Sequence, residues 1–221
     1  MTDFAAARQK MVDNQLRTSA ITDRRVLAVM AQVPREVFVP EERRELSYID
    51  EAHRLPSSDG VAHYLAAPAP FARLVQLARI ESDDRVLDVG CGTGYSAAVL
   101  AGLAAQVVAT ESDTGLAGTA RAQLAALGLG NVEVVEAPAD AGARDRGPFD
   151  VIVLEGAVND VPAPLLAQLA DGGRLVALLR RGASAVAHLY VRSGDDVAGR
   201  PQFNTTLPPL PMAPRPSEFV F

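Results

Sequence analysis

Three glycines, each separated from the next by one residue, follow a short apolar run and precede an alanine-rich segment. The string VLDVGCGTGY covers residues 86–95 and contains Gly90, Gly92 and Gly94. Glycine tolerates a positive φ and lets a ligand lie against bare main chain. In open α/β sheets, ligands bind beyond the carboxyl ends of the strands, where such a strand-to-helix turn lies. The spacing therefore predicts a cofactor-binding turn.

The residues around this turn discriminate between two cofactor classes. A dinucleotide fold requires a small residue where this chain has Tyr95. The string reads instead Asp-x-Gly-x-Gly-x-Gly from Asp88, and it resembles the first motif of class I methyltransferases. This resemblance implies S-adenosyl-L-methionine as the cofactor, with Asp88 near its methionine amine or, alternatively, acting only as a turn cap. The residues expected along the cofactor are Asp88, Gly90, Cys91, Gly92, Gly94 and Tyr95.

A carboxylate at the end of the next predicted strand completes the cofactor pattern. Glu111 lies 21 residues beyond Gly90 and can accept hydrogen bonds from ribose hydroxyls. Taken alone it could be an exposed acid that ends a strand, but next to the glycine turn it predicts a ribose ligand. Ser112 either lines the adenosine pocket or, with Asp113, caps the following helix, and we favour the cap.

Composition restricts the remaining function classes. The 221 residues are 48% hydrophobic and 22% charged, which indicates one globular core. A formal net charge of −6 argues against a nucleic-acid partner. No apolar stretch approaches the roughly 20 residues of a membrane span, and the first residues lack the pattern of a secretory signal. The single cysteine suits a reducing compartment, so we expect a cytoplasmic protein. No His, Cys and acidic residues have metal-site spacing.

From residue 85 onwards, short apolar runs alternate with alanine-rich amphipathic segments, which is typical of βα units. We expect a doubly wound, Rossmann-like α/β sheet of seven strands. The predicted strands are Arg85–Val89, Gln106–Glu111, Val132–Glu136, Asp150–Leu154, Arg174–Leu179, Ala187–Arg192 and, as a possible seventh, Phe219–Phe221. The predicted helices between them are Tyr95–Leu103, Thr114–Leu127 and Ala163–Leu169.

The segments outside this sheet have separate predicted roles. Residues 1–47 have helical spacing of apolar side chains, and residues 57–70 form a connector that should fold over the cofactor. We expect residues 1–80 to form a helical extension and lid, and residues 81–221 to form the cofactor-binding domain, within one compact unit. The proline-rich string TLPPLPMAPRP is either a polyproline segment that binds a partner or, as we favour, a stiff connector back to the sheet.

Longer strings resemble one methyltransferase family. MVDNQLRTSAITDRRVLAVMAQVPREVFVP at 11–40, VLDVGCGTGYSAAVLAGLAAQVVATE and GPFDVIVLEGAVNDVP resemble protein-L-isoaspartate O-methyltransferases, from about Met11 to Leu179. The VPREVFVP segment makes the resemblance specific, because many methyltransferases share the glycine motif. The resemblance implies an enzyme that methylates the side-chain carboxylate of isomerised aspartyl residues in proteins and so starts their repair.

Three positions depart from the family pattern. Ala66 stands where the family has a serine near the methyl-transfer site. Glu155 follows the fourth strand, where the family has small or hydroxyl residues, and a buried carboxylate there would repel an anionic acceptor by a few kcal/mol. Residues 137–139, Ala-Pro-Ala, replace an acidic adenine-loop motif.

Candidate acceptor-site residues follow from these departures. Glu155 could act as a general base or anchor an amine, or it could be a solvated loop residue. His63 and Tyr64, in the connector, could donate hydrogen bonds to the acceptor. The leading hypothesis is an isoaspartyl methyltransferase acting on protein or peptide substrates. The alternatives are a methyltransferase for a small-molecule hydroxyl or amine acceptor, and a cofactor-binding protein without catalysis. The oligomeric state is left open.

Overall fold

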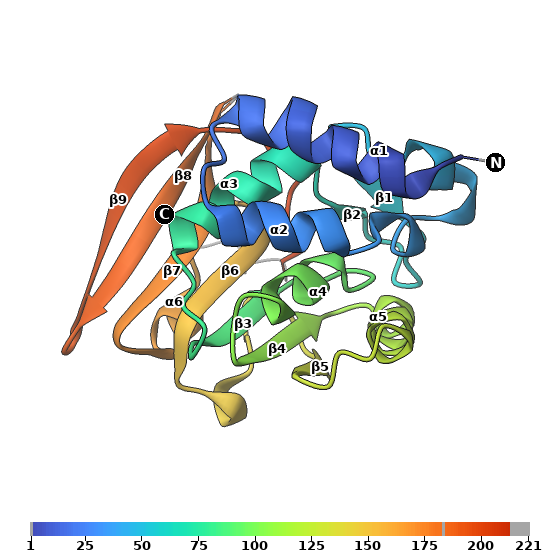
Figure 1. The fold of residues 1–221 in the computed structure, drawn as a ribbon. Helices are drawn as coiled ribbons and strands as arrows, with labels where there is room; N and C mark the ends of the chain where they lie inside the picture. Colours follow the sequence, from blue (N-terminus) through green and yellow to red (C-terminus); the bar gives the residue numbers. More distant parts are fainter. Residues whose placement is uncertain (1, 183, 213–221) are drawn as a thin grey trace.

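A seven-stranded, mostly parallel sheet forms the centre of the molecule (Figure 1). The computed structural model describes residues 2–182 and 184–212. The strands lie in the order β5-β4-β3-β6-β7-β8-β9, and only the pairs that involve β8 are antiparallel. Their bounds are β3 Arg85–Val89, β4 Gln106–Glu111, β5 Val132–Glu136, β6 Phe149–Val158, β7 Leu169–Arg181, β8 Ser184–Ser193 and β9 Asp196–Asn204. The order reverses next to β3, so the glycine turn after β3 lies at the switch point of the sheet.

Helices follow the parallel strands as the apolar spacing requires. Asp113 accepts a hydrogen bond from the Leu116 amide and so caps the helix after β4. Gly128 follows the end of that helix with a left-handed backbone, at φ 70°. Its amide donates a hydrogen bond to the Ala125 carbonyl in the last turn. The helices of this part are α3 Pro68–Ala78, α4 Tyr95–Ala101, α5 Thr114–Ala126 and α6 Ala163–Leu166.

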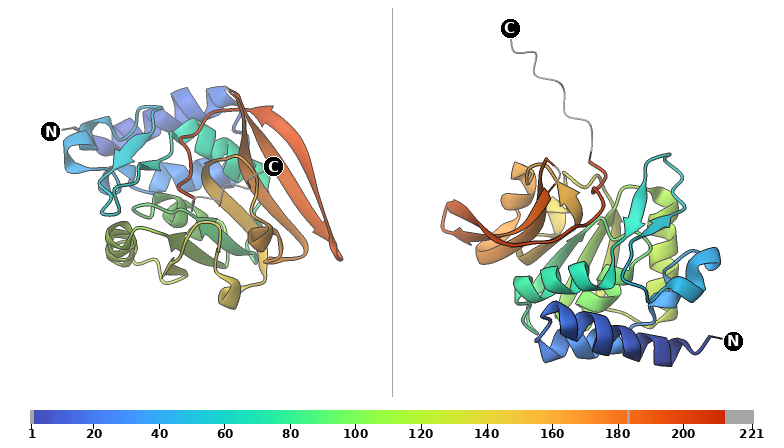
Figure 2. Two further views of the ribbon diagram at one scale, coloured as in Figure 1. Left: turned by 180° about the vertical axis from the view of Figure 1, so that it is seen from behind. Right: turned by 90° about the horizontal axis from the view of Figure 1, so that it is seen from above.

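The N-terminal part adds a second helical layer and a small hairpin. Its helices α1 and α2 lie outside α3, away from the sheet (Figure 2). The hairpin pairs β1 with β2 in antiparallel register, His53 opposite Leu65. The elements are α1 Phe4–Met11, a π-helix Val12–Leu16, 3-10 turns Arg17–Ser19, Arg35–Val37 and Glu41–Leu46, α2 Arg24–Gln32, β1 His53–Leu55 and β2 His63–Leu65.

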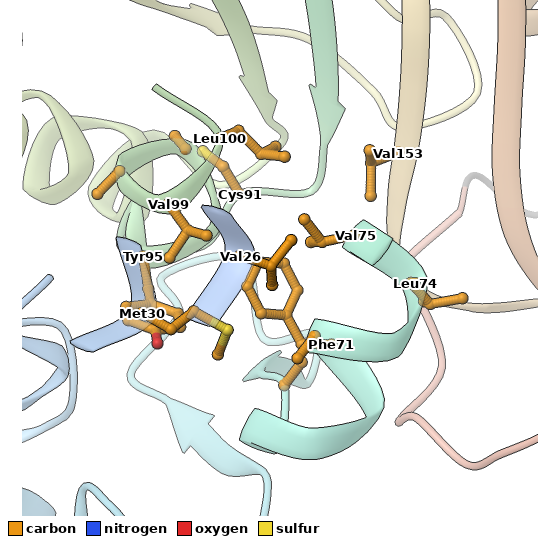
Figure 3. Packing of buried hydrophobic residues seen from close by; sticks show 14 of the residues in the cluster. Val26, Met30, Phe71, Leu74, Val75, Cys91, Tyr95, Val99, Leu100 and Val153 are labelled. Carbon is orange, nitrogen blue, oxygen red and sulfur yellow. The ribbon is translucent and has the colours of Figure 1, made fainter. Parts of the chain in front are cut away.

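The sheet separates two hydrophobic clusters. Alternate side chains of β3 point to opposite faces: Val86 belongs to one cluster, and Leu87 and Val89 to the other. The larger cluster joins the sheet to the N-terminal helices, and Figure 3 shows Val26 and Met30 of α2 near Phe71 and Tyr95. Both faces of the central strands are therefore buried, as expected for parallel strands covered by helices.

A buried arginine explains why the VPREVFVP segment has a fixed position. The guanidinium of Arg35 is fully buried and donates hydrogen bonds to the carbonyls of Ser47 (2.7 Å) and Ala66 (2.6 Å). It also lies 4.7 Å from the ring centre of Tyr95. Burial lowers its pKa to about 10, so it stays charged at neutral pH. Arg35 thus ties the N-terminal segment to the connector before α3.

The predicted α/β fold with a helical extension is confirmed, with local differences. Strand β6 is longer than predicted and contains Glu155, which is therefore not a loop residue. Helix α6 ends at Leu166 instead of Leu169, and β7 begins at Leu169 instead of Arg174, with an irregular register against β6 between Phe149 and Val151. The seventh strand is β9, whereas the predicted strand at 219–221 lies outside the described residues.

The proline-rich segment 205–212, hereafter the strap, crosses the carboxyl end of β6. The Ala157 amide donates to the Pro208 carbonyl (2.8 Å), and the Leu210 amide donates to the Ala157 carbonyl (3.0 Å). Leu210 is buried against two glycines: a Cβ on Gly90 would overlap its side chain, and a Cβ on Gly156 would lie 2.7 Å from its nitrogen. The strap therefore lies directly beside the glycine turn.

None of the helices in the described ranges is long and apolar enough to cross a membrane.

Candidate active site

The glycine turn has a backbone that only glycine adopts easily. Gly90, Gly92 and Gly94 have φ values of 85°, 57° and 99°. The Gly90 and Cys91 amides both donate to the Thr110 carbonyl, at 2.9 and 3.0 Å, which holds the turn against β4. The turn therefore presents bare main chain at the carboxyl end of β3.

Glu111 ends β4 with a buried carboxylate, 2% exposed, aimed at the turn. One oxygen accepts a hydrogen bond from the Gly92 amide (2.8 Å), and the other accepts from the amides of Ser112 (2.7 Å) and Asp113 (3.0 Å). Burial alone would raise its pKa, but hydrogen bonds from His63 and these amides lower it. Glu111 is therefore an ionised acceptor beside the glycines.

His63 links this carboxylate to the connector. Its Nδ1 lies 3.2 Å from Oε1 of Glu111, and its Nε2 lies 2.9 Å from Oδ2 of Asp59. Burial opposes protonation, but the two carboxylates outweigh it and raise the His63 pKa to about 9. A carboxylate oxygen of Asp113 accepts hydrogen bonds from the Ser58 hydroxyl (2.7 Å) and the Asp59 amide (2.9 Å). These contacts fasten residues 57–63 over the end of β4.

Asp88 and Glu155 form a pair of neighbouring carboxyl groups beside the glycine turn. Asp88 is fully buried at the end of β3, where one oxygen accepts a hydrogen bond from the Ser96 hydroxyl (2.7 Å). Glu155 lies in β6 where its pairing with β7 shifts register, between Val153 and Ala157. Oδ1 of Asp88 and Oε1 of Glu155 are buried and find no other partner. Burial, then the neighbouring Asp88, raises the Glu155 pKa well above its usual value.

This pair changes the interpretation of Glu155. Two carboxyl groups in contact can hydrogen-bond only when one of them carries a proton. Burial raises the pKa of Asp88 to about 7, and its hydrogen bonds to Ser96 and Glu155 oppose that rise. The raised pKa of Glu155 favours its neutral form, and a neutral Glu155 would not repel an anionic acceptor.

Two cavities meet at Tyr64. The first lies between the glycine turn and the strap, and its lining includes His63, Glu111, Ser112, Ala137 and Ala139. The second is lined by Tyr64, Leu65, Ala66, Phe71, Gly90, Cys91, Tyr95, Ser96 and Glu155. Tyr64, Gly90 and Glu155 border both cavities. The structure thus brings the predicted cofactor and acceptor residues together around one turn.

The strap limits the space in the first cavity. Its volume is about 20 Å³, which is room for about one water molecule. Leu210 fills the space above Gly90. A larger ligand therefore requires Leu210 to shift. The sequence does not indicate this contact, because the proline pattern predicts a stiff segment but not what lies beneath it.

Other predicted residues have mainly structural contacts. The ring of Tyr95 packs between Phe38 and Phe71, with ring centres 5.7 and 5.8 Å away. The Cys91 thiol is buried, and burial followed by nearby carboxylates raises its pKa well above the usual value. Asp113 is the helix cap, as favoured, whereas Ser112 lines the first cavity. Within residues 2–182 and 184–212, no group of three metal-ligating side chains is present.

Comparisons with known proteins agree on one family. The model of the protein-L-isoaspartate(D-aspartate) O-methyltransferase family matches residues 6–209. A protein-L-isoaspartate O-methyltransferase of Koribacter versatilis is 43% identical over 86% of this chain and 83% of its own length. Protein-L-isoaspartate O-methyltransferase 1 of Rhodopseudomonas palustris is 40% identical over 89% and 79%.

Solved structures share the fold at lower identity. A protein-L-isoaspartate O-methyltransferase superposes with a TM-score of 0.79 at 24% identity, over 91% of this chain and 65% of the other. A Plasmodium falciparum protein assigned to the same enzyme class, in complex with S-adenosyl-L-homocysteine, superposes with a TM-score of 0.76 at 21% identity, over 92% and 98%.

Proposed function

Because the chain belongs to the protein-L-isoaspartate O-methyltransferase family, we propose that it methylates the side-chain carboxylate of isoaspartyl residues in proteins or peptides, using S-adenosyl-L-methionine. The family match across residues 6–209 is the observation that carries this proposal. We further propose a cytoplasmic enzyme, in line with its single cysteine.

The chemistry of the site fits this cofactor. Glu111 is an ionised, oriented acceptor for ribose hydroxyls, and Asp88 has a buried oxygen free of other partners for the methionine ammonium. Gly90 and Gly92 would let the cofactor lie against the main chain, and Ser112, Ala137 and Ala139 would border its adenosine part. The sulfonium supplies an electrophilic methyl group, so the protein needs no strong base.

The acceptor is expected to be ionised before it binds, since an aspartate-like carboxyl has a pKa of about 3.9. The main task of the protein is then to hold oxygen, carbon and sulfur in line and to exclude water, which contributes about 7–11 kcal/mol in well-oriented reactions. Tyr64, which borders both cavities, is placed to donate a hydrogen bond to the acceptor.

The test is methyl transfer from radiolabelled S-adenosyl-L-methionine to a peptide with one isoaspartyl residue. The same peptide with a normal aspartyl residue is the matched control. We expect labelling of the isoaspartyl peptide only, as a base-labile methyl ester. Calorimetric binding of the cofactor without labelling of either peptide would contradict the proposed acceptor, and absence of cofactor binding would contradict the whole assignment.

A further inference from the structure

We propose that Glu155, as an uncharged carboxylic acid, donates the hydrogen bond that holds the acceptor carboxylate in the second cavity. The inference rests on the proposed function, because it takes an isoaspartyl carboxylate as the acceptor. It gives Glu155 a role opposite to the general base or repulsive charge that its residue type suggests.

The lining of the second cavity leaves few donors for an anion. Among the described residues that line it, none is Lys, Arg or His. Ser96 already donates its hydroxyl proton to Asp88, whereas the Tyr95 hydroxyl is buried without a hydrogen-bond partner. Ala66 contributes only a methyl group. The remaining side-chain hydroxyl donors are Tyr64, Tyr95 and, when protonated, Glu155, and of these only Tyr64 and Glu155 also border the first cavity.

Several features keep the proton on Glu155. Its Oε1 is buried beside Asp88, and the two strands place both carboxyls at the same end of the sheet, with Asp88 opposite Val153. The other groups that face this cluster are Glu111 from β4, which disfavours a negative charge on Asp88, and the Cys91 thiol, which the carboxylates keep uncharged. His63 lines the first cavity and is committed to Glu111 and Asp59.

The proton can move to a new partner without leaving Glu155. Asp88 and Glu155 each have one buried oxygen without another hydrogen-bond partner, so a proton on Glu155 would let it donate to Asp88. When Asp88 instead accepts from the ammonium of the methyl donor, it no longer needs the Glu155 hydrogen bond. Glu155 can then turn its O–H towards the acceptor carboxylate, which has no proton of its own at neutral pH. The net charge of the pair stays at −1, so no proton is released.

The experiment compares wild type, Glu155→Gln and Glu155→Ala with isoaspartyl peptide at saturating cofactor, from pH 6.5 to 9.5. Glu133→Gln, which removes an exposed carboxylate of β5, is the matched control. We expect Glu155→Ala to lower kcat/KM about 10- to 100-fold, mainly through KM, as for loss of one hydrogen bond to a charged group. The Glu155→Gln variant keeps a neutral hydrogen-bond donor, so its kcat/KM at pH 7 should stay within about threefold of the wild-type value.

The pH profile gives a readout that a purely structural role would not change. Wild-type kcat/KM should fall towards alkaline pH as Glu155 ionises. The kcat/KM of Glu155→Gln should not show this fall, because glutamine does not ionise. His63 is present in both proteins, so its own titration cancels in the comparison. Calorimetry should show cofactor affinities within about threefold in all variants.

Three results would overturn the proposal while leaving the proposed function intact. These are full or increased activity of Glu155→Ala, loss of activity in a folded Glu155→Gln that binds cofactor, and a wild-type profile identical to that of Glu155→Gln. The last comparison holds even if Glu155→Ala fails to fold. Wild type that binds cofactor but never labels the isoaspartyl peptide would remove the proposed function, and this inference with it.

Discussion

Among the described residues, five hydrogen-bond donors surround Glu111 before any ligand binds, and one of them is the Ser112 hydroxyl at 3.4 Å. The amides of Gly92, Ser112 and Asp113 fix its orientation, and His63 adds a positive charge. A carboxylate held this way loses little entropy when it accepts a further hydrogen bond. The residue spacing predicts the carboxylate, but not the histidine behind it.

The His63 contacts should make stability depend on pH. The folded-state pKa of about 9 exceeds the ordinary 6.5, so this stabilisation is complete below pH 6.5 and is lost as pH rises towards 9. We expect His63→Gln to lower the free energy of unfolding by roughly 2 kcal/mol at pH 6, and by progressively less towards pH 9. Urea unfolding at several pH values measures this difference.

The control is His188→Gln, which removes an imidazole that bonds a backbone carbonyl on β8. If the difference in free energy of unfolding between wild type and His63→Gln grew with pH, this result would contradict the proposed charge on His63.

At the scale of elements, the strap and the register shift in β6 define the space beside the glycine turn. Gly156 lies in the irregular stretch of β6, where a side chain would collide with the Leu210 backbone. The strap therefore packs against the stretch of β6 that is not in regular register with β7. Leu210 also belongs to the cluster on the far face of the sheet from the N-terminal helices.

We expect Leu210→Ala to accelerate cofactor association several-fold, because the shortened side chain no longer fills the space above Gly90. Like other buried Leu→Ala changes, it should also lower stability by about 2–5 kcal/mol. Leu207→Ala is the matched control, since Leu207 is equally buried in the strap but packs in the other cluster. Stopped-flow binding measures both rates.

Equal association rates for Leu210→Ala and wild type would show that the strap does not restrict access to the site. Faster association in Leu207→Ala as well would point to general loosening of the strap rather than to the space above Gly90.

Local sequence patterns were sufficient for the parallel strands and the glycine turn, because strand alternation and glycine spacing act within a few residues. They were insufficient for contacts between distant segments. The pKa of Glu155 depends on Asp88, 67 residues earlier, and the chain just after β2 is held by a hydrogen bond from Arg35 to the Ala66 carbonyl. The sequence does not predict β9, because its string DVAGRPQFN contains Gly199 and Pro201 and lacks the apolar alternation of a buried strand.

At the scale of the whole molecule, the N-terminal helices share one core with the sheet. Met11, Leu16 and Met30 lie in the same cluster as Val86 and Val151. We therefore propose that residues 1–80 and 81–221 fold as one cooperative unit.

Deletion of residues 1–22 should consequently unfold the protein rather than release a stable cofactor-binding domain. It removes four fully buried apolar side chains, at about 1.5–3 kcal/mol each, which together approach the 5–15 kcal/mol net stability of a typical domain. The buried residues are Met11, Val12, Leu16 and Ile21. Circular dichroism should show no cooperative thermal transition for the deletion variant, whereas full-length protein gives one. A folded deletion variant that still binds cofactor would contradict the shared core.

Cys91 lies between two glycines of the turn, buried and surrounded by carboxyl groups that suppress its thiolate. Peroxides and electrophiles attack the thiolate, not the thiol. The glycine turn therefore contains a sulfur that is shielded from oxidation and alkylation, so we expect the turn to stay chemically intact in an oxidising solution.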